Sequence, residues 1–220
     1  MNGEKEQFLL LKELWNKGCK MKIGIIKYGM GNIQSVYNAF NYFKVEIDFA
    51  SLKNLDEFDA IVLPGVGAFK DTARLLKPYK KEISEYISIG KPFLGICVGL
   101  QYLFEKSFEK GNWNGLGFFK GDITKLPENK LPQIGWNKIK IIKENRLLKD
   151  IKSGSYVYYI NSFAASKENA LATSFYGCEF AAIVGRGNIF GTQFHPEKSG
   201  EVGLKIIKNF IEVAKNVCNS

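Results

Sequence analysis

One cysteine stands in a setting that suits nucleophilic chemistry. Cys97 lies in the stretch Gly95–Gln101, with a glycine two residues before it and another two residues after it. An apolar run precedes this stretch and a helix-like run follows it. A nucleophile flanked in this way, on a sharp turn from strand to helix, has the form of a nucleophile elbow. A lone cysteine is more often a buried structural residue, so other parts of the chain must decide between the two interpretations.

The chain contains a single histidine, so any step that needs an imidazole from this chain must use His195. Pro196 and Glu197 follow it, and the proline restricts His195 to extended conformations. A carboxylate two residues on can reach back to one ring nitrogen, fix the tautomer and stabilise the imidazolium. Such a pair is often a surface coincidence, but a cysteine followed by a late histidine matches hydrolytic folds of the elbow type. We therefore predict a catalytic triad of Cys97, His195 and Glu197.

Attack of a thiolate on an amide carbonyl builds an oxyanion, which backbone N–H groups must bind. The N–H of Val98, directly after the nucleophile, is one candidate donor. The segment Pro64–Gly67 follows an apolar run and could form either a plain turn or an anion-binding nest of N–H groups. We predict that Gly65, Val66 and Gly67 complete the oxyanion site.

The elements that must position these residues have the pattern of an open α/β fold. Continuously apolar segments predict a mostly parallel sheet, and the segments between them predict helices on both of its faces. Strands are expected at 22–27, 45–50, 59–63 and 92–94, and helices at 33–43, 70–89, 100–106 and 202–217. Sites in such sheets form at the carboxyl ends of the strands. The glycine-rich turns and Cys97 should therefore meet at one edge of the sheet.

The middle of the chain changes character and predicts an antiparallel strand extension or a second small sheet. Its strands are expected at 138–143, 155–163, 171–175, 180–185 and 188–193. We expect an N-terminal extension over residues 1–20, to which we assign no chemistry, and a single domain over residues 21–220. A dinucleotide site after the first strand is disfavoured, because position 34 is Gln where the fingerprint needs a third glycine.

Composition limits the classes of function. The apolar fraction of 45% and the charged fraction of 24% are those of a soluble globular protein, and no apolar run reaches the ~18 residues of a membrane span. The cysteines have no metal-ligand spacing, and Cys19 and Cys218 lie near the ends, so neither a metal site nor a disulfide framework is expected. The net charge is +9, but the lysines are scattered, so we expect no nucleic-acid partner. Without a secretory signal, a cytoplasmic location is expected.

Three motifs in this order resemble those of the class I, or triad, glutamine amidotransferases: Pro64–Phe69, Gly95–Gln101 and Phe194–Ser199. The resemblance narrows to the glutaminase subunits of imidazole glycerol phosphate synthase on three further segments: Tyr28–Val36, Ile134–Asn137 and Gly187–Gly191. The likeness covers about residues 21–210, and the set of motifs in this order is far more specific than any one of them.

The resemblance implies a flavodoxin-like fold and hydrolysis of L-glutamine to glutamate and ammonia, with Cys97 forming a γ-glutamyl thioester. It implies that His195 acts as base and acid, that Glu197 orients it, and that Gln101 and Ser162 contact glutamine. Ammonia would pass to a separate (β/α)₈ cyclase subunit, in a heterodimer that makes imidazole glycerol phosphate and AICAR in histidine biosynthesis. No metal and no other cofactor is implied. The positions that would face the partner are Asn32, Tyr158 and Lys198.

The chain departs from the usual family pattern at four positions: Lys27, Gln133, Asn161 and Phe163, where Asp, His, His and Tyr are common. These positions are expected near the active-site or partner-facing edge, so they leave open a paralogous glutaminase that supplies ammonia for lipopolysaccharide or flagellar sugars. A glutaminase-like subunit that only binds a partner is an alternative of another class, and the intact triad argues against it. Glutaminases of pyridoxal phosphate synthesis are disfavoured, because they carry Gly-Gly-Glu-Ser at 64–67.

Overall fold

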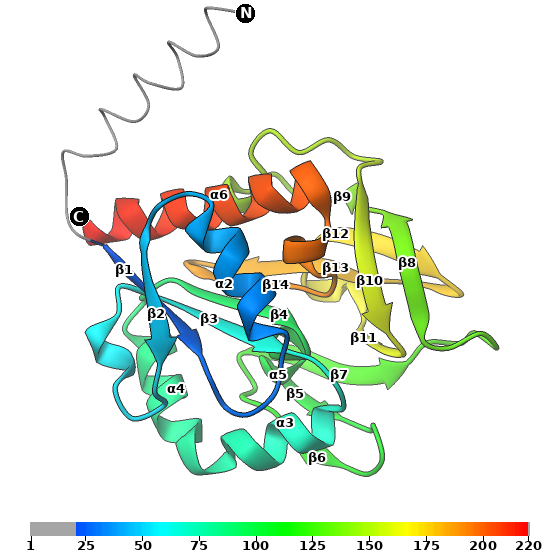
Figure 1. Ribbon diagram of the computed structural model, residues 1–220. Helices are drawn as coiled ribbons and strands as arrows, with labels where there is room; N and C mark the ends of the chain where they lie inside the picture. Colours follow the sequence, from blue (N-terminus) through cyan, green and yellow to red (C-terminus); the bar gives the residue numbers. More distant parts are fainter. Residues whose placement is uncertain (1–20, 220) are drawn as a thin grey trace, which may run out of the picture.

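The computed structural model describes residues 21–219, so the predicted extension over residues 1–20 lies outside the described residues. The described chain forms a central eight-stranded sheet with helices packed against it (Figure 1), in the strand order β2-β1-β3-β4-β14-β13-β12-β9. Two smaller sheets, β10-β8 and β11-β7-β5-β6, flank it. The division of the chain into an extension and one domain stays a prediction.

The strands are β1 Lys22–Ile26, β2 Glu46–Ala50, β3 Ala60–Gly65, β4 Phe93–Cys97, β5 Phe104–Ser107, β6 Trp113–Asn114, β7 Phe119–Lys125, β8 Gln133–Lys138, β9 Lys140–Ile141, β10 Tyr156–Asn161, β11 Phe163–Ala165, β12 Ala170–Tyr176, β13 Cys178–Arg186 and β14 Ile189–Thr192. The α-helices are α2 Ile33–Asn41, α3 Phe69–Leu76, α4 Lys80–Ser88, α5 Val98–Tyr102 and α6 Gly200–Cys218.

The half of the large sheet from β2 to β14 is parallel. Its inner strands β3 and β4 are buried along their full length, and β1 is buried from its second residue onward. A strand covered on both faces must be apolar throughout, which is why these segments read as continuous apolar runs. The predicted fold class, an open and mostly parallel α/β sheet with an antiparallel extension, is confirmed.

Helices cover both faces of the parallel half (Figure 1): α2 and α6 lie on one face, and α3, α4 and α5 on the other. The rings of Phe40 and Phe210 join α2 to α6, meeting edge to face with their centroids 6.2 Å apart. Asn32 caps α2, because its side-chain oxygen accepts a hydrogen bond from the Ser35 N–H. Pro78 lies in the turn between α3 and α4, where the predicted helical region was expected to break.

One predicted helix is too long. The helix after Cys97 was expected to run to residue 106, but α5 ends at Tyr102 and the chain continues as strand β5. The carbonyls of Tyr102 and Phe104 accept hydrogen bonds from the N–H groups of Leu116 and Gly117. In a continued helix, these carbonyls would accept hydrogen bonds from N–H groups four residues further along. Hydrogen bonds from the loop at 116–117 take their place, so the helix ends.

The strand predicted at 138–143 is observed only as the short strand β9, and the longer strand β8 precedes it from Gln133. β8 pairs only with β10 in a two-stranded ribbon that stands beside the large sheet in Figure 1. Its polar Gln133 is buried, whereas its apolar Ile134 and Trp136 are exposed. The usual alternation of buried apolar and exposed polar residues is therefore inverted, and the pattern does not predict this strand.

No disulfide framework is expected from the sequence, yet Cys218 at the end of α6 is disulfide-bonded, whereas Cys97 and Cys178 are free thiols. Spacing along the chain does not decide this, since a disulfide requires Cα atoms within about 7 Å, which the fold determines.

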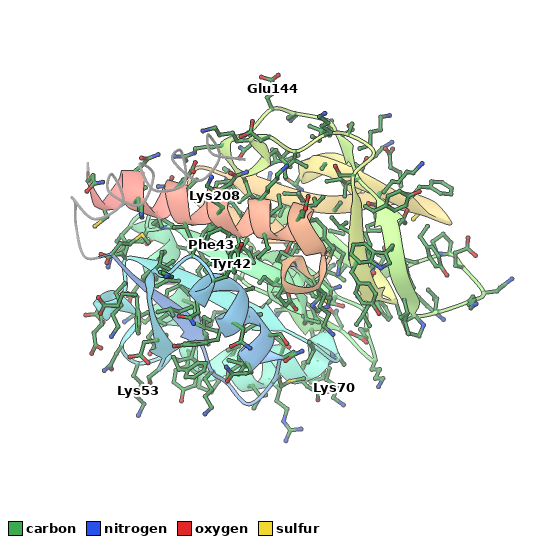
Figure 2. The ribbon with its side chains drawn as sticks, turned by 45° about the horizontal axis from the view of Figure 1, so that its top comes forward. Tyr42, Phe43, Lys53, Lys70, Glu144 and Lys208 are labelled. Carbon is green, nitrogen blue, oxygen red and sulfur yellow. The ribbon has the colours of Figure 1, made fainter. Side chains whose placement is uncertain are left out.

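The labelled lysines in Figure 2, Lys53, Lys70 and Lys208, come from three separate parts of the fold: the loop after β2, α3 and α6. Within residues 21–219, no helix is both long and apolar enough to cross a membrane. The same residues contain no cluster of three or more His, Cys, Asp or Glu side chains that could hold a metal ion.

Candidate active site

Cys97 stands where β4 ends and α5 begins, and its backbone is strained. Its φ of 56° and ψ of −110° fall in a region that residues with a side chain rarely occupy. The neighbouring glycines are required by space: a Cβ on Gly95 would lie 2.5 Å from the Gly99 carbonyl oxygen, and one on Gly99 would lie 2.0 Å from that of Leu63. The predicted turn from strand to helix is therefore present, and its backbone packs closely against β3.

His195 reaches Cys97 because their strands are neighbours. β14 runs parallel to β4, with Thr192 opposite Ile96, so the chain leaves the sheet edge beside the nucleophile. His195 is extended ahead of Pro196, as predicted, and its Nδ1 lies 2.8 Å from Oε1 of Glu197. The two side chains are only 3% and 1% exposed, so water does not screen the pair.

The surroundings of His195 favour its protonated form. Burial lowers the pKa of the imidazole, but the hydrogen bond and charge of Cys97, followed by those of Glu197, outweigh burial and raise the pKa of His195 to about 10. A negative charge on the sulfur therefore favours the protonated ring of His195. This arrangement places a proton donor, the His195 ring, beside the Cys97 sulfur.

Cys97 and His195 open onto a pocket of about 220 Å³. Five more of the predicted site residues line it: Val66, Gly67, Val98, Gln101 and Ser162. Because Val98 is the first residue of α5, its N–H has no acceptor within the helix and is available to an oxyanion. The pocket thus brings a cysteine sulfur, an imidazole and an unpaired helix N–H together at the carboxyl ends of the parallel strands.

Gly65 has a different place from the one predicted. Pro64 and Gly65 belong to β3, where Gly65 pairs with Cys97, and a Cβ on Gly65 would lie 2.6 Å from the Gly99 nitrogen. Gly65 therefore permits the close packing of β3 against the elbow. The loop that faces the pocket is shorter than expected and consists of Val66 and Gly67, the latter with a φ of 92° that favours glycine.

Two functional candidates escaped the sequence reasoning. Glu109 lines the pocket, and its carboxylate accepts a hydrogen bond of 2.7 Å from the Phe69 N–H. It reaches the site only because α5 is short and β5 turns back, and no local pattern signals this. Gln193 is buried next to Cys97, and its Nε2 lies 3.8 Å from the Cys97 sulfur. Its position two residues before His195, directly after the strand that leads to the site, is a signal that could have found it.

The three predicted partner-facing residues lie on elements that meet around the triad. Lys198 is exposed in the short 3₁₀ turn that follows His195, and both α2, which Asn32 caps, and β10 contact this turn. Tyr158 of β10 is tied to it by its backbone: its carbonyl accepts from the His195 N–H, and its N–H donates to Oγ of Ser199.

The four departures from the family pattern fall in two places. Asn161 and Phe163 line the catalytic pocket, and Gln133 pairs with Asn161 across the β8–β10 ribbon. Side-chain oxygens of both Gln133 and Asn161 are buried without a hydrogen-bond partner. Lys27 lies elsewhere, in a separate pocket of about 630 Å³ at the ends of β1 and β2.

The sequence of the chain matches a known protein family. The family model described as "Glutamine amidotransferase class-I" matches residues 25–213. The chain belongs to this family. The amidotransferase is 49% identical over 200 residues to the imidazole glycerol phosphate synthase subunit HisH of Caldanaerobacter subterraneus subsp. tengcongensis, covering 88% of this chain and 98% of that protein. The HisH subunit of Methanocaldococcus jannaschii is 42% identical over 194 residues, covering 87% and 99%.

Solved structures share the fold of this amidotransferase. The structure of PurLQS from Thermotoga maritima superposes with a TM-score of 0.71 at 22% identity, covering 88% of this chain and 99% of the matched chain. At this level of identity the likeness concerns the fold alone. The family resemblance read from the three motifs is confirmed by the family match and by the HisH relatives.

Proposed function

We propose that this amidotransferase is the glutaminase subunit of an imidazole glycerol phosphate synthase, hydrolysing L-glutamine to glutamate and ammonia. Family membership and the names of its relatives support the reaction and the pathway. The observation that carries the chemistry is the Cys97 sulfur on a strained elbow, at a pocket that it shares with a buried His195–Glu197 pair.

The Cys97 thiolate attacks the side-chain amide carbon of glutamine, and the oxyanion that forms is met by the N–H of Val98 and by the backbone of Val66 and Gly67. His195 then gives its proton to the leaving nitrogen, which departs as ammonia and leaves a γ-glutamyl thioester. In the second half, His195 takes a proton from water as the water attacks the thioester, which releases glutamate and restores the thiolate. Glu197 holds Nδ1, so Nε2 faces the reaction.

The pocket offers matching groups for the other end of glutamine. The carboxylate of Glu109 suits the α-ammonium group, and the Ser162 segment lies across the same pocket. Nε2 of Gln101 donates to the Phe163 carbonyl and to Oε1 of Gln193, so its own Oε1 is the atom that can contact the substrate.

The outer face of the β8–β10 ribbon supports a partner on this side of the molecule. Ile134 is 64% exposed and Trp136 55% exposed, and they pair across the ribbon with Ile160 and Tyr158. Ile160 also lines the catalytic pocket, so the apolar face extends from the surface to the site of ammonia release. Exposed apolar surface of this kind marks interaction sites. A (β/α)₈ cyclase bound there, in a cytoplasmic heterodimer, would receive ammonia without its passage through bulk water.

The relatives named above carry the histidine-pathway name, which does not favour the surface-sugar alternative. The complete triad around the pocket likewise does not favour a subunit that only binds a partner.

Growth and turnover together test the proposal. Co-expression with its own cyclase, in a strain that lacks both subunits, should restore growth without histidine, whereas the Cys97→Ser variant should not. Purified Cys97→Ser protein should release no glutamate from glutamine but should bind the cyclase as the wild type does. Cys178→Ser, which changes a free thiol outside the pocket, is the matched control and should behave as wild type. Substantial turnover by Cys97→Ser would contradict the mechanism, and failure of the wild-type chain to restore growth would contradict the pathway.

A further inference from the structure

The side chains of Gln193 and His195 both lie within hydrogen-bond distance of the Cys97 sulfur. β14 ends at Thr192 and the chain bends at Gln193 and Phe194, so that the side chains of Gln193 and His195 both reach the sulfur. Phe194 between them points the other way into the core, where its ring meets that of Tyr159 at 5.9 Å. Gln193 is fully buried, and its side-chain amide lies 3.8 Å from the sulfur, within the range of a hydrogen bond to sulfur.

The hydrogen-bond network fixes which end of this amide faces the sulfur. The Phe163 carbonyl can only accept, so the Gln101 atom that lies 2.9 Å from it must be the NH₂ group. The same NH₂ group lies 3.1 Å from Gln193 and must meet an acceptor, which makes that atom Oε1. The remaining atom of the Gln193 amide is Nε2, and it presents an N–H donor to Cys97.

We propose that Gln193 is a further catalytic residue, which donates a hydrogen bond to the Cys97 sulfur and favours the thiolate over the thiol. Gln101 is then a positioning residue that acts through Gln193 as well as a substrate contact. The inference rests on the proposed role of Cys97 as the nucleophile.

The donor complements His195 rather than duplicating it. A thiol can donate its proton to the Ile160 carbonyl, 3.8 Å away, but a thiolate has no proton to give and needs donors. His195 supplies a donor only while it is protonated, and it gives that proton to the leaving amine. The neutral Gln193 N–H stays in place throughout, so the thiolate restored at the end of the cycle still meets a donor.

The reactivity of Cys97 with iodoacetamide, measured as a function of pH on the purified full chain, tests the inference. The labelled Cys97 peptide is followed by mass spectrometry, which separates it from other cysteines. Gln193→Met keeps a similar volume without a donor, so alkylation at pH 7 should be about tenfold slower, since a hydrogen bond to a charged group contributes on this order. At high pH, where every variant is a thiolate, the rates should converge. Equal profiles, or a uniform loss at every pH, would overturn the inference.

Two further variants show whether a change in the pH profile comes from the Gln193 hydrogen bond, and not from misfolding or from the loss of any buried amide. Gln101→Met leaves Gln193 in place but removes the hydrogen bond that holds the Gln193 amide, which is then free to rotate. This variant should therefore shift the pH profile of Cys97 alkylation in the same direction as Gln193→Met. The double variant should shift the profile little further than Gln193→Met alone. Gln133→Met removes a buried amide that has no contact with the sulfur, and its profile should match the wild type; a shift as large as that of Gln193→Met would overturn the inference. If Gln193→Met shows no shift while Cys97→Ser is inactive, only this inference fails and the proposed function stands.

Discussion

At the scale of single residues, the proposed chemistry depends on an imidazole held between a sulfur and a carboxylate. Oε1 of Glu197 meets the ring, but its Oε2 is buried with no hydrogen-bond partner. A buried acceptor without a partner costs free energy, so an arrangement optimised only for stability would not keep it. The ion pair with His195 offsets this cost as long as the ring stays protonated.

Replacement of Glu197 by Gln should show this pairing in both rate and stability. Glutamate release should fall by about 10²- to 10⁴-fold, because the ring loses the partner that orients it and stabilises its charge. The folded-state pKa of His195 lies above its ordinary 6.5, so the stabilisation is complete below that pH and is lost as the pH rises toward about 10. Urea unfolding should therefore give the largest difference between wild type and variant near pH 6, shrinking toward pH 10.

Glu179→Gln is the matched control, because it removes a carboxylate from the exposed pair with Lys167. Exposed pairs contribute little, so its unfolding free energy should hardly change and its activity should be retained. A Glu197→Gln difference that grows with pH would contradict the assigned charge state.

At the scale of elements, the elbow depends on how closely β3, β4 and α5 approach one another. Gly95, Gly99 and Gly65 all lie at this crossing, and each would bring a Cβ within 2.6 Å of a backbone atom. The crossing holds the strained Cys97 backbone in place, since strain of this kind persists only where the surroundings over-determine it.

Gly99→Ala should therefore displace the elbow. A Cβ would lie 2.0 Å from the Leu63 carbonyl, so β3 or α5 must move, at a cost of about 1–3 kcal/mol in unfolding free energy and with near-complete loss of glutaminase activity. Chemical denaturation and glutamate release measure the two effects. Gly154→Ala is the control: it also strains the backbone, at a φ of 90°, but has nothing within 4 Å. It should lose stability without losing activity, and equal loss of activity in both variants would contradict the role of the elbow.

At the scale of the whole molecule, the parallel sheet gathers the site at one edge, and the β8–β10 ribbon extends that edge toward solvent (Figure 1). Strand β8 of the ribbon buries the polar Gln133 and exposes the apolar Ile134 and Trp136, which a free surface does not require. A partner that covers Trp136 and Ile134 would account for the inversion.

Trp136→Ser should weaken binding to the cyclase by about 30-fold or more, because exposed tryptophans buried at the centre of an interface often contribute at least 2 kcal/mol. Titration calorimetry with the purified cyclase measures this. The control is Ile89→Ser, since Ile89 is equally exposed but precedes β4 at the opposite edge of the sheet. Its affinity should match the wild type, and an unchanged affinity for Trp136→Ser would place the partner elsewhere.

The sequence by itself determined the parallel half of the fold and singled out the residues that we propose as the triad. The apolar runs of β3 and β4 are local signals, because strands covered on both faces need apolar side chains at every position. Cys97 and His195 are predicted from the sequence because the glycine pattern around the elbow and the single histidine left few alternatives. The N-cap at Asn32 and the break at Pro78 are local in the same way.

Only the tertiary structure decided which side chains meet across elements. Gln193 reaches Cys97 because Thr192 pairs with Ile96. The register of two strands cannot be predicted from the sequence of either strand alone. α5 ends at Tyr102 because the carbonyl of Tyr102 accepts a hydrogen bond from a distant loop, at Leu116. That early end of the helix brings Glu109 into the pocket. Gly65 serves the packing of the elbow rather than the pocket for the same reason: its neighbours are Val98 and Gly99, more than thirty residues away. Contacts between segments far apart depend on the whole fold, and no local pattern of residues encodes them.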